Sequence, residues 1–319
     1  MEKLKTKRRS GSAASAERKE TFHLDLMSLP GVLLLVVFNY LPMIGIVIAF
    51  KDYNPNLGIW GSAWNGLDNL KFFFTSQDAA RTIRNTLMYS SSFLVLDLIC
   101  AVGLALMFYN LRSRRALKFY NTVVILPRFM SPVIIAFIVY IILNPSYGLL
   151  NQLIIALGGS KIQWYSNSKY WPAILTITHI WQTVGMNCII YYASLMSLDD
   201  SLLEAARLDG ANKWQTLWKV TIPNVMPSIT ICMFLTLTNG FKLFDQNLAL
   251  TGGQPYIINP DGTTVHTTEM LALNIYNTFY GQNANARGTA QAKAVLFFIL
   301  VAAIGLIQLS ATRKKEVQQ

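Results

Sequence analysis

The sequence predicts an all-α membrane protein with about six transmembrane helices and both termini in the cytoplasm. Of its 319 residues, 53% are hydrophobic and only 13% are charged, whereas a soluble domain usually carries about a quarter charged residues. Six apolar stretches are long enough to cross about 30 Å of hydrocarbon as helices. The basic residues lie between these stretches, as membrane topology requires, so the net charge of +11 does not indicate a nucleic-acid partner.

The apolar stretches define one transmembrane domain over residues 28–311. The first contains Pro42, which membrane helices tolerate. The second contains Asp97, which we expect to face other helices because an ionisable group is costly in lipid. The fifth is the most polar, with Asn239, Gln246 and other polar residues near its far end. The six expected spans are residues 28–50, 87–109, 121–143, 171–196, 224–248 and 292–311.

The distribution of Lys and Arg predicts the orientation of these spans. Residues 1–27 form a basic tail without a signal-peptide cleavage pattern, and residues 312–319 form the other terminus. Seventeen basic residues fall on the side of the two termini and eight on the opposite side. Cytoplasmic loops carry the excess of basic residues, so we expect both termini inside. The outer loops are then residues 51–86, 144–170 and 249–291.

The last outer loop contains two local signals. Residues 259–264 form a Pro-Asp-Gly turn signal. In residues 268–280, Leu271, Ile275 and Phe279 recur every four residues, which predicts an amphipathic helix on the outer surface.

The inner connection, residues 198–223, is predicted to form two short helices. Ser201 and Glu204 fit a capping box at the start of the first, and Gly210 is placed to end it in the left-handed conformation. Residues 212–215 repeat the capping pattern, and Pro223 is expected to close the second helix.

The second short helix carries Trp214, Leu217 and Trp218 on one face. An interfacial helix pair anchored in lipid headgroups accounts for these residues, with Glu204 serving only as a cap. A protein partner that covers the tryptophans accounts for them as well.

The motifs of this connection resemble the EAA loop of ABC importer permease subunits. The matching residues are Glu204-Ala205-Ala206, Asp209-Gly210-Ala211 and Ile222-Pro223. Further matches to the sugar-importer branch, which includes the maltose system's first permease, are Trp181, Gly185, Phe244-Asp245, residues 250–253 and residues 39–42. Residues 38–55 are most similar to the subgroup that imports complex oligosaccharides. Gly252-Gly253-Gln254-Pro255 departs from the family's Gly-Gly-Pro and loosens the alignment of the outer loop.

The resemblance implies the ABC type I importer permease fold, in the bacterial cytoplasmic (inner) membrane. The chain would be a non-catalytic subunit with no cofactor of its own. No GxxxxGK[ST] phosphate loop is present, so ATP and Mg would be bound by partner ATPase subunits. The implied partners are a second homologous permease, two ATP-binding subunits and an extracytoplasmic solute-binding protein. The implied ATPase-coupling residues are Glu204, Ala205, Ala206, Asp209, Gly210 and Trp214.

The resemblance also implies an oligosaccharide path between the fourth, fifth and sixth spans. Hydroxyl and amide side chains suit a sugar, because each dehydrated hydroxyl needs a partner. Trp181 and Tyr191 are candidates for stacking on a sugar ring. The alternative is that the same Thr and Asn side chains hold helices together. The implied path residues are Gln182, Thr183, Met186, Asn187, Thr236, Asn239, Gly240, Lys242, Leu243 and Asp245.

Lys242 and Asp245 leave two interpretations open. Their i, i+3 spacing allows them to neutralise each other. Alternatively, Lys242 with Arg128 favours an acidic sugar such as a uronate oligosaccharide.

An ion-coupled secondary transporter of a polar solute is the alternative function. It should show mid-membrane acids in repeated halves, but Asp97 is the sole candidate and no repeat is evident. His179 and His266 are assigned no chemistry, and capping explains the Asp199-Asp200 pair.

Overall fold

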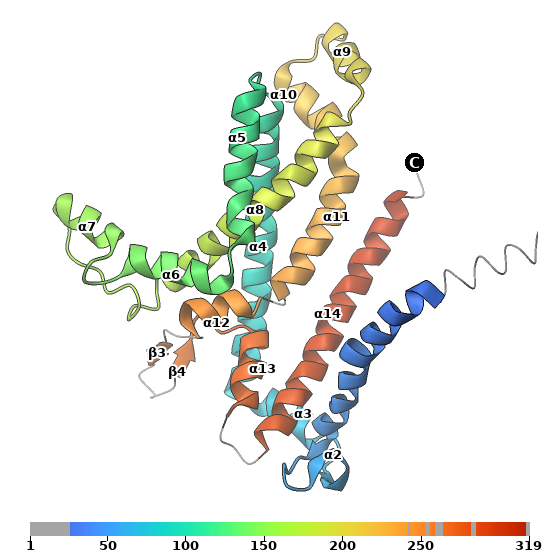
Figure 1. The fold of residues 1–319 in the computed structure, drawn as a ribbon. Coiled ribbons are helices and arrows are strands. Elements are labelled where there is room, and N and C mark those ends of the chain that lie inside the picture. The colour runs from blue at the N-terminus through green and yellow to red at the C-terminus, as the bar shows by residue number, and fades with distance from the viewer. Residues whose placement is uncertain (1–25, 242, 253–255, 259–263, 282–284, 317–319) are drawn as a thin grey trace, which may run out of the picture.

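The computed structural model describes residues 26–241, 243–252, 256–258, 264–281 and 285–316. These residues form a mostly helical protein (Figure 1). Among them, five helices are long and apolar enough to cross a membrane, or six if one bent pair counts as a span. The five are Leu26–Phe50, Ala79–Tyr109, Trp171–Met196, Lys213–Phe241 and Ala286–Ile307.

Two short antiparallel hairpins accompany the helices. The first pairs Lys51 with Trp64, and the second pairs Tyr256 with His266. The elements are η1 (Val36–Tyr40), η2 (Leu41–Phe50), β1 (Lys51–Asp52), α2 (Gly58–Gly61), β2 (Ala63–Trp64), α3 (Asp68–Thr75), α4 (Gln77–Tyr109), α5 (Arg114–Ile125), η3 (Leu126–Phe129), α6 (Pro132–Leu143), α7 (Leu149–Ala156), α8 (Trp171–Met196), α9 (Asp200–Leu208), α10 (Lys213–Thr216), η4 (Leu217–Thr221), α11 (Ile222–Phe241), α12 (Asp245–Thr251), β3 (Tyr256–Ile258), β4 (Thr264–His266), α13 (Leu271–Phe279) and α14 (Ala286–Glu316).

The core lies where α4 packs along α8 and α11. One cluster surrounds Phe93 and Trp171, and a second surrounds Ala101 and Cys188. Gly185 of α8 allows α5 to approach closely, because a Cβ at this position would overlap the backbone oxygen of Val124. The helix interior therefore uses glycine here despite its entropic cost.

The expectation of one continuous span over residues 121–143 is wrong. The helix from Arg114 to Phe129 and the helix from Pro132 to Leu143 meet at a bend of 104°. Pro132 has no backbone N–H to continue the first helix, and Ser131 begins the next one by accepting a hydrogen bond from the N–H of Ile134 (3.3 Å). Helix α6 consequently turns aside and packs against α12 and α7 (Figure 1).

Several other boundaries differ from expectation. The fifth span ends at Phe241, and its expected polar end forms the separate helix α12. Helices α4 and α14 begin earlier than expected, at Gln77 and Ala286. In the first span, η1 is a π-helical turn, and the chain continues from Leu41 as the 3-10 helix η2, which has Pro42 in its first turn.

Helix α13 confirms the expected helix but not its surface position. Leu271 and Leu273 are buried, and the helix packs against α14 and α4. Phe279, in its last turn, is exposed. Of the turn predicted at residues 259–264, only Thr264 lies within the described residues.

Helix α9 lies at one end of the molecule, hereafter the α9 end, and the C-terminal end of α14 points toward it (Figure 1). Helices α2 and α3 lie at the opposite end. The first span runs from the middle of the view to α2, and α14 packs beside it and runs the other way, toward the α9 end (Figure 1).

Candidate transport cavity and coupling helix

Asp199 caps the start of α9. Its Oδ1 accepts a hydrogen bond from the backbone N–H of Ser201 (2.9 Å), and this bond lowers the pKa of the carboxyl. The expected capping box of Ser201 and Glu204 is therefore wrong, because the helix begins two residues earlier than that pattern requires. The Glu204 side chain is exposed and is not needed for the cap.

Gly210 ends α9 as expected. Its φ of +79° lies in the left-handed region that glycine adopts without strain. The N–H of Gly210 bonds to the oxygen of Arg207 (3.1 Å), and the N–H of Ala211 bonds to that of Ala206 (3.0 Å). This pair of bonds is the Schellman motif, which fixes the direction in which the chain leaves the helix.

The second short helix begins as expected but does not end at Pro223. Asn212 and Gln215 form a reciprocal capping box. The chain then remains helical from Lys213 to Phe241, through a widened turn in which the N–H of Ile222 bonds to the oxygen of Leu217. The second half of this connection, from Lys213, is thus one continuous helix with α11, and residues 209–212 join it to α9.

The surface around α9 is open. Glu204, Ala205, Asp209 and Gly210 are exposed, and Ala206 is half-buried. Trp214 is 68% exposed and Trp218 is 55% exposed, with their rings in edge contact at 6.0 Å between centroids. The six residues assigned to ATPase coupling therefore lie together at the α9 end.

A cavity of about 450 Å³ is lined by residues of η3, α6, α8, α11 and α12. Most of the expected path residues line it: Gln182, Thr183, Met186, Asn187, Thr236, Asn239, Leu243 and Asp245. Gly240 does not, because it is buried against Ser90 of α4. Lys242 lies outside the described residues, so the two interpretations of the Lys242–Asp245 pair are untested.

Several residues outside the expected path set also line this cavity. They are Arg128, Pro132, His179, Ile190, Leu235, Phe244 and Gln246. Arg128 entered only as a companion of Lys242. The bend before α6, which the hydropathy pattern does not reveal, brings Arg128 and Pro132 to this place.

Asp97 does not line the cavity but is hydrogen-bonded to two side chains that do, those of Thr183 and Asn187. It is 1% exposed. Its Oδ1 accepts a hydrogen bond from Thr183 Oγ1 (3.1 Å), and its Oδ2 accepts one from Asn187 Nδ2 (2.6 Å). Asn187 Nδ2 also donates to Thr236 Oγ1 (3.2 Å). The carboxylate faces other helices, as expected, and two donors offset its removal from water.

His179 belongs to a second polar pair, which the sequence did not indicate. Its Nδ1 lies 3.1 Å from Gln246 Oε1, and its ring packs on Phe93 at 4.1 Å between centroids. Polar residues within apolar helices are the signal that points to such pairs. Tyr191 is buried in the core, which contradicts its expected stacking on a sugar ring. Trp181 does not line this cavity but is exposed, so its stacking role stays a prediction.

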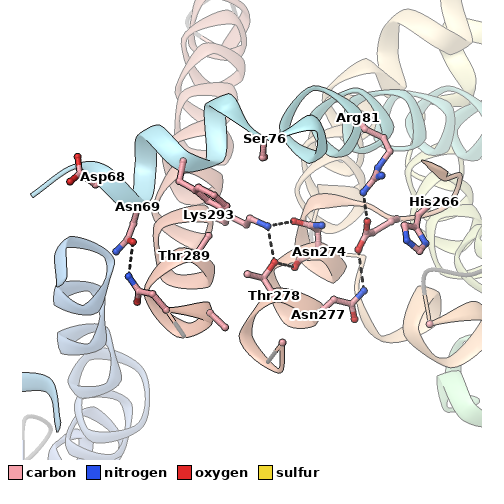
Figure 2. Close-up of a pocket in the computed structure, with 16 residues that line it drawn as sticks. Asp68, Asn69, Ser76, Arg81, His266, Asn274, Asn277, Thr278, Thr289 and Lys293 are labelled. Carbon is pink, nitrogen blue, oxygen red and sulfur yellow. Dashed lines mark hydrogen bonds and ion pairs between the residues drawn. The ribbon is translucent and has the colours of Figure 1, made fainter. Parts of the chain in front are cut away.

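A larger cavity, of about 950 Å³, lies between α3, α4, α13 and α14 (Figure 2). Arg81 and Glu269 form a buried ion pair there (2.8 Å), and Glu269 also accepts from Asn277. Lys293 Nζ donates to Asn274 Oδ1 and Thr278 Oγ1, both at 2.7 Å. These bonds link α4 and α14 to α13 and to Glu269 just before it.

The fold defines a helical protein with several apolar helices long enough to span a membrane, a cavity lined partly by polar side chains, and an exposed short helix, α9. The chain belongs to the family of binding-protein-dependent transport system inner membrane components, whose profile matches residues 98–314. It is therefore a transport component and not a catalytic subunit.

Two curated relatives are sugar-transport permeases. The chain is 36% identical over 296 residues to the probable starch degradation products transport system permease protein AmyD of Thermoanaerobacterium thermosulfurigenes, covering 91% of this chain and 93% of that one. It is 32% identical over 285 residues to the polygalacturonan/rhamnogalacturonan transport system permease protein YteP of Bacillus subtilis (strain 168), covering 89% and 84%.

Two solved structures have the same fold. One is a bacterial ABC transporter involved in the import of the acidic polysaccharide alginate, with a TM-score of 0.81, 29% identity, and coverage of 93% of this chain and 97% of that chain. The other is a bacterial alginate ABC transporter in complex with its alginate pentasaccharide-bound periplasmic protein, with a TM-score of 0.79, 27% identity, and coverage of 93% and 96%. The chain is accordingly a permease subunit of an ABC sugar importer.

Proposed function

We propose that this chain forms half of the pore of an ATP-driven oligosaccharide importer that works by alternating access. The observation that carries this proposal is the continuity between two features. The helix that lines the cavity with Thr236 and Asn239 runs unbroken into the connection that presents α9. A displacement of α9 would therefore reach the cavity wall directly.

The partners follow from the same geometry. The cavity is lined by one chain and is open, so a second permease would complete it. An ATP-binding subunit would bind each permease, and a groove on it would cover the exposed side chains of Trp214, Trp218 and Glu204. ATP and Mg would be bound there. A solute-binding protein would deliver the sugar to the α2 end, outside the cell, while both termini and α9 face the cytoplasm.

An acidic oligosaccharide is the substrate class that we propose. Arg128 lines the cavity and is exposed, and Lys242, which lies outside the described residues, directly follows Phe241 in the sequence. A similar structure belongs to a transporter of an acidic polysaccharide. Lys242→Met should weaken the uptake of a uronate oligosaccharide far more than that of a neutral one. Equal losses would contradict this substrate class.

The coupling role is tested by Gly210→Pro in the reconstituted complex. Proline fixes φ near −65° and cannot adopt the +79° of Gly210. We expect the loss of both uptake and binding-protein-stimulated ATPase activity while the subunits still assemble. Gly158→Pro is the matched control, because Gly158 has a φ of +83° in a connection far from α9. If both variants behave alike, the coupling role of α9 is wrong.

A further inference from the structure

The segment that follows the first span exposes two tryptophans. This segment, residues 51–64, consists of β1, α2 and β2 and is hereafter the 51–64 segment. Trp60 is 79% exposed and Trp64 is 68% exposed. Trp is a highly buried residue type on average, and exposed apolar groups that lie together mark surfaces that bind a partner or a membrane. The two indoles therefore call for an explanation.

Lys51 holds this segment in one shape. Its side chain is buried, and its Nζ donates to the backbone oxygens of Ile59 (2.8 Å), Trp60 (3.3 Å) and Ser62 (3.1 Å). The same Nζ lies 4.9 Å from the centroid of the Trp64 ring, a cation–π contact. A buried ammonium is stable only when its donors are paired, so Lys51 fixes both α2 and the ring of Trp64. The exposure of the indoles is thus built into the fold.

Two asparagines tie the 51–64 segment to neighbouring helices. Asn69 of α3 donates from Nδ2 to the backbone oxygens of Ala49 (3.0 Å) and Lys51 (2.9 Å). Asn285, just before α14, donates to Asn69 Oδ1 (2.9 Å) and accepts from the backbone N–H of Tyr53 (3.2 Å). The end of the first span, α3 and the start of α14 are thereby joined at one place.

The length of the first span places the 51–64 segment at a membrane surface. The span runs from Leu26 to Phe50, and only 6% of its apolar window is buried inside the protein. A rise of about 1.5 Å per residue up to Tyr40 and about 2.0 Å over η2 gives a length of roughly 40 Å. The hydrocarbon core is about 30 Å thick, and the headgroup layers bring the bilayer to about 40–45 Å. The segment that begins at Lys51 therefore lies in a headgroup layer, at the end opposite α9 (Figure 1).

The composition of this part of the chain matches a headgroup layer. Residues 53–67 contain no Asp, Glu, Lys or Arg, although about a quarter of the residues in a soluble domain are charged. Trp is enriched at membrane–water interfaces because its ring is apolar and its N–H needs a polar acceptor. Since the 51–64 segment directly follows a helix whose side chains face lipid, the bilayer is the partner that already lies beside it.

We propose that the 51–64 segment is a membrane-interface anchor, in which the indoles of Trp60 and Trp64 lie in the headgroup layer at the α2 end. Their rings cover the uppermost acyl carbons, and their N–H groups donate to phosphate or ester oxygens of the lipids. Lys51 is the positioning residue for both indoles. Through Asn69 and Asn285, the anchor sets the depth of the first span, α3 and α14 in the membrane. This role goes beyond the proposed transport function and requires only that the chain is embedded in a bilayer.

The test is depth-dependent quenching of tryptophan fluorescence. The full chain is reconstituted in phosphatidylcholine whose acyl chains carry bromine either near the glycerol backbone or near the terminal methyl group. The difference between the wild type and Trp60→Phe/Trp64→Phe isolates the emission of these two indoles among the seven tryptophans. We expect the shallow bromine to quench this emission more than the deep bromine does, and acrylamide in the water to quench it less than it quenches free tryptophan.

Trp171→Phe is the matched control, because Trp171 is fully buried and its emission should show weaker quenching by either lipid. Lys51→Met keeps a long apolar side chain but removes the donors to three backbone oxygens. The difference between shallow and deep quenching should therefore shrink in this variant, and an unchanged difference would overturn the positioning role of Lys51.

Three results would overturn the anchor. The first is equal quenching of the two indoles by shallow and deep bromine, and the second is quenching by acrylamide as strong as that of free tryptophan. The third is protection from acrylamide only when a solute-binding protein is added, because the surface would then belong to a protein partner. If Trp60→Phe/Trp64→Phe does not reconstitute, each single variant must show the same preference for the shallow bromine, or the proposal fails.

Discussion

Exchanging Asp97 and Asn187 tests whether their hydrogen bond joins α4 to α8. In Asp97→Asn, the new amide has one oxygen for the two donors that the carboxylate now satisfies, Thr183 Oγ1 and Asn187 Nδ2. One charge-assisted bond is lost, and a buried donor is left to face another. The structure therefore predicts destabilisation of about 2–3 kcal/mol for the single variant.

The double variant Asp97→Asn/Asn187→Asp restores a donor opposite an acceptor. The amide introduced on α4 would donate to the carboxylate introduced on α8, and Thr183 would donate to the oxygen of that amide. We expect about 2 kcal/mol of the loss to be recovered, as measured by a double-mutant cycle of SDS-induced unfolding in mixed micelles. Simple additivity of the two single variants would refute the pairing. The double variant also places a carboxylate beside the cavity, so uptake of an acidic oligosaccharide should stay low even though stability returns.

Three further variants test other parts of the structure. Gly185→Ala should destabilise the protein by about 1–3 kcal/mol in the same unfolding assay, because its Cβ would overlap Val124, whereas Gly103→Ala has open space and should be nearly neutral; equal effects would contradict the close approach of α5. Glu269→Gln leaves the Arg81 guanidinium buried without its carboxylate, so we expect a loss of about 3–5 kcal/mol, and a change under about 1 kcal/mol in the same unfolding assay would show that the pair is not needed. The pKa of Asp199 is lowered in the folded chain, so its stabilisation of α9 is fully present above the carboxyl's ordinary pKa and is lost as pH falls through the lowered value. The protection factor of the Ser201 amide, its exchange relative to the intrinsic rate at each pH, should therefore fall at low pH in the wild type and not in Asp199→Asn, and identical profiles would refute the cap.

The composition and the apolar runs were sufficient to predict the helical membrane class, since both depend on length and hydropathy alone. The bend between α5 and α6 was missed because residues 121–143 are continuous in hydropathy, although Pro127 and Pro132 lie within them. Proline is tolerated in membrane helices, so its presence alone does not locate a break. Pro223 shows the reverse case, because it was expected to end a helix and instead lies in the first turn of α11.

The positions of the candidate site residues could be predicted more fully than their partners. The expected path residues were assigned from a motif resemblance, and most of them line one cavity. The pairing of Asp97 with Asn187 and of His179 with Gln246 joins residues 90 and 67 positions apart. Helix periodicity carries no information about such contacts, which depend on how α4, α8 and α12 pack together.

The most direct test of the central claim is uptake of a labelled oligosaccharide by proteoliposomes that contain this chain, a second permease, the ATP-binding subunits and the solute-binding protein. The account predicts that uptake requires ATP inside the cytoplasmic compartment and the binding protein outside, and that it persists when all ion gradients are collapsed. Uptake that proceeds without ATP or without the ATP-binding subunits, driven by an ion gradient, would contradict the importer assignment and favour an ion-coupled transporter.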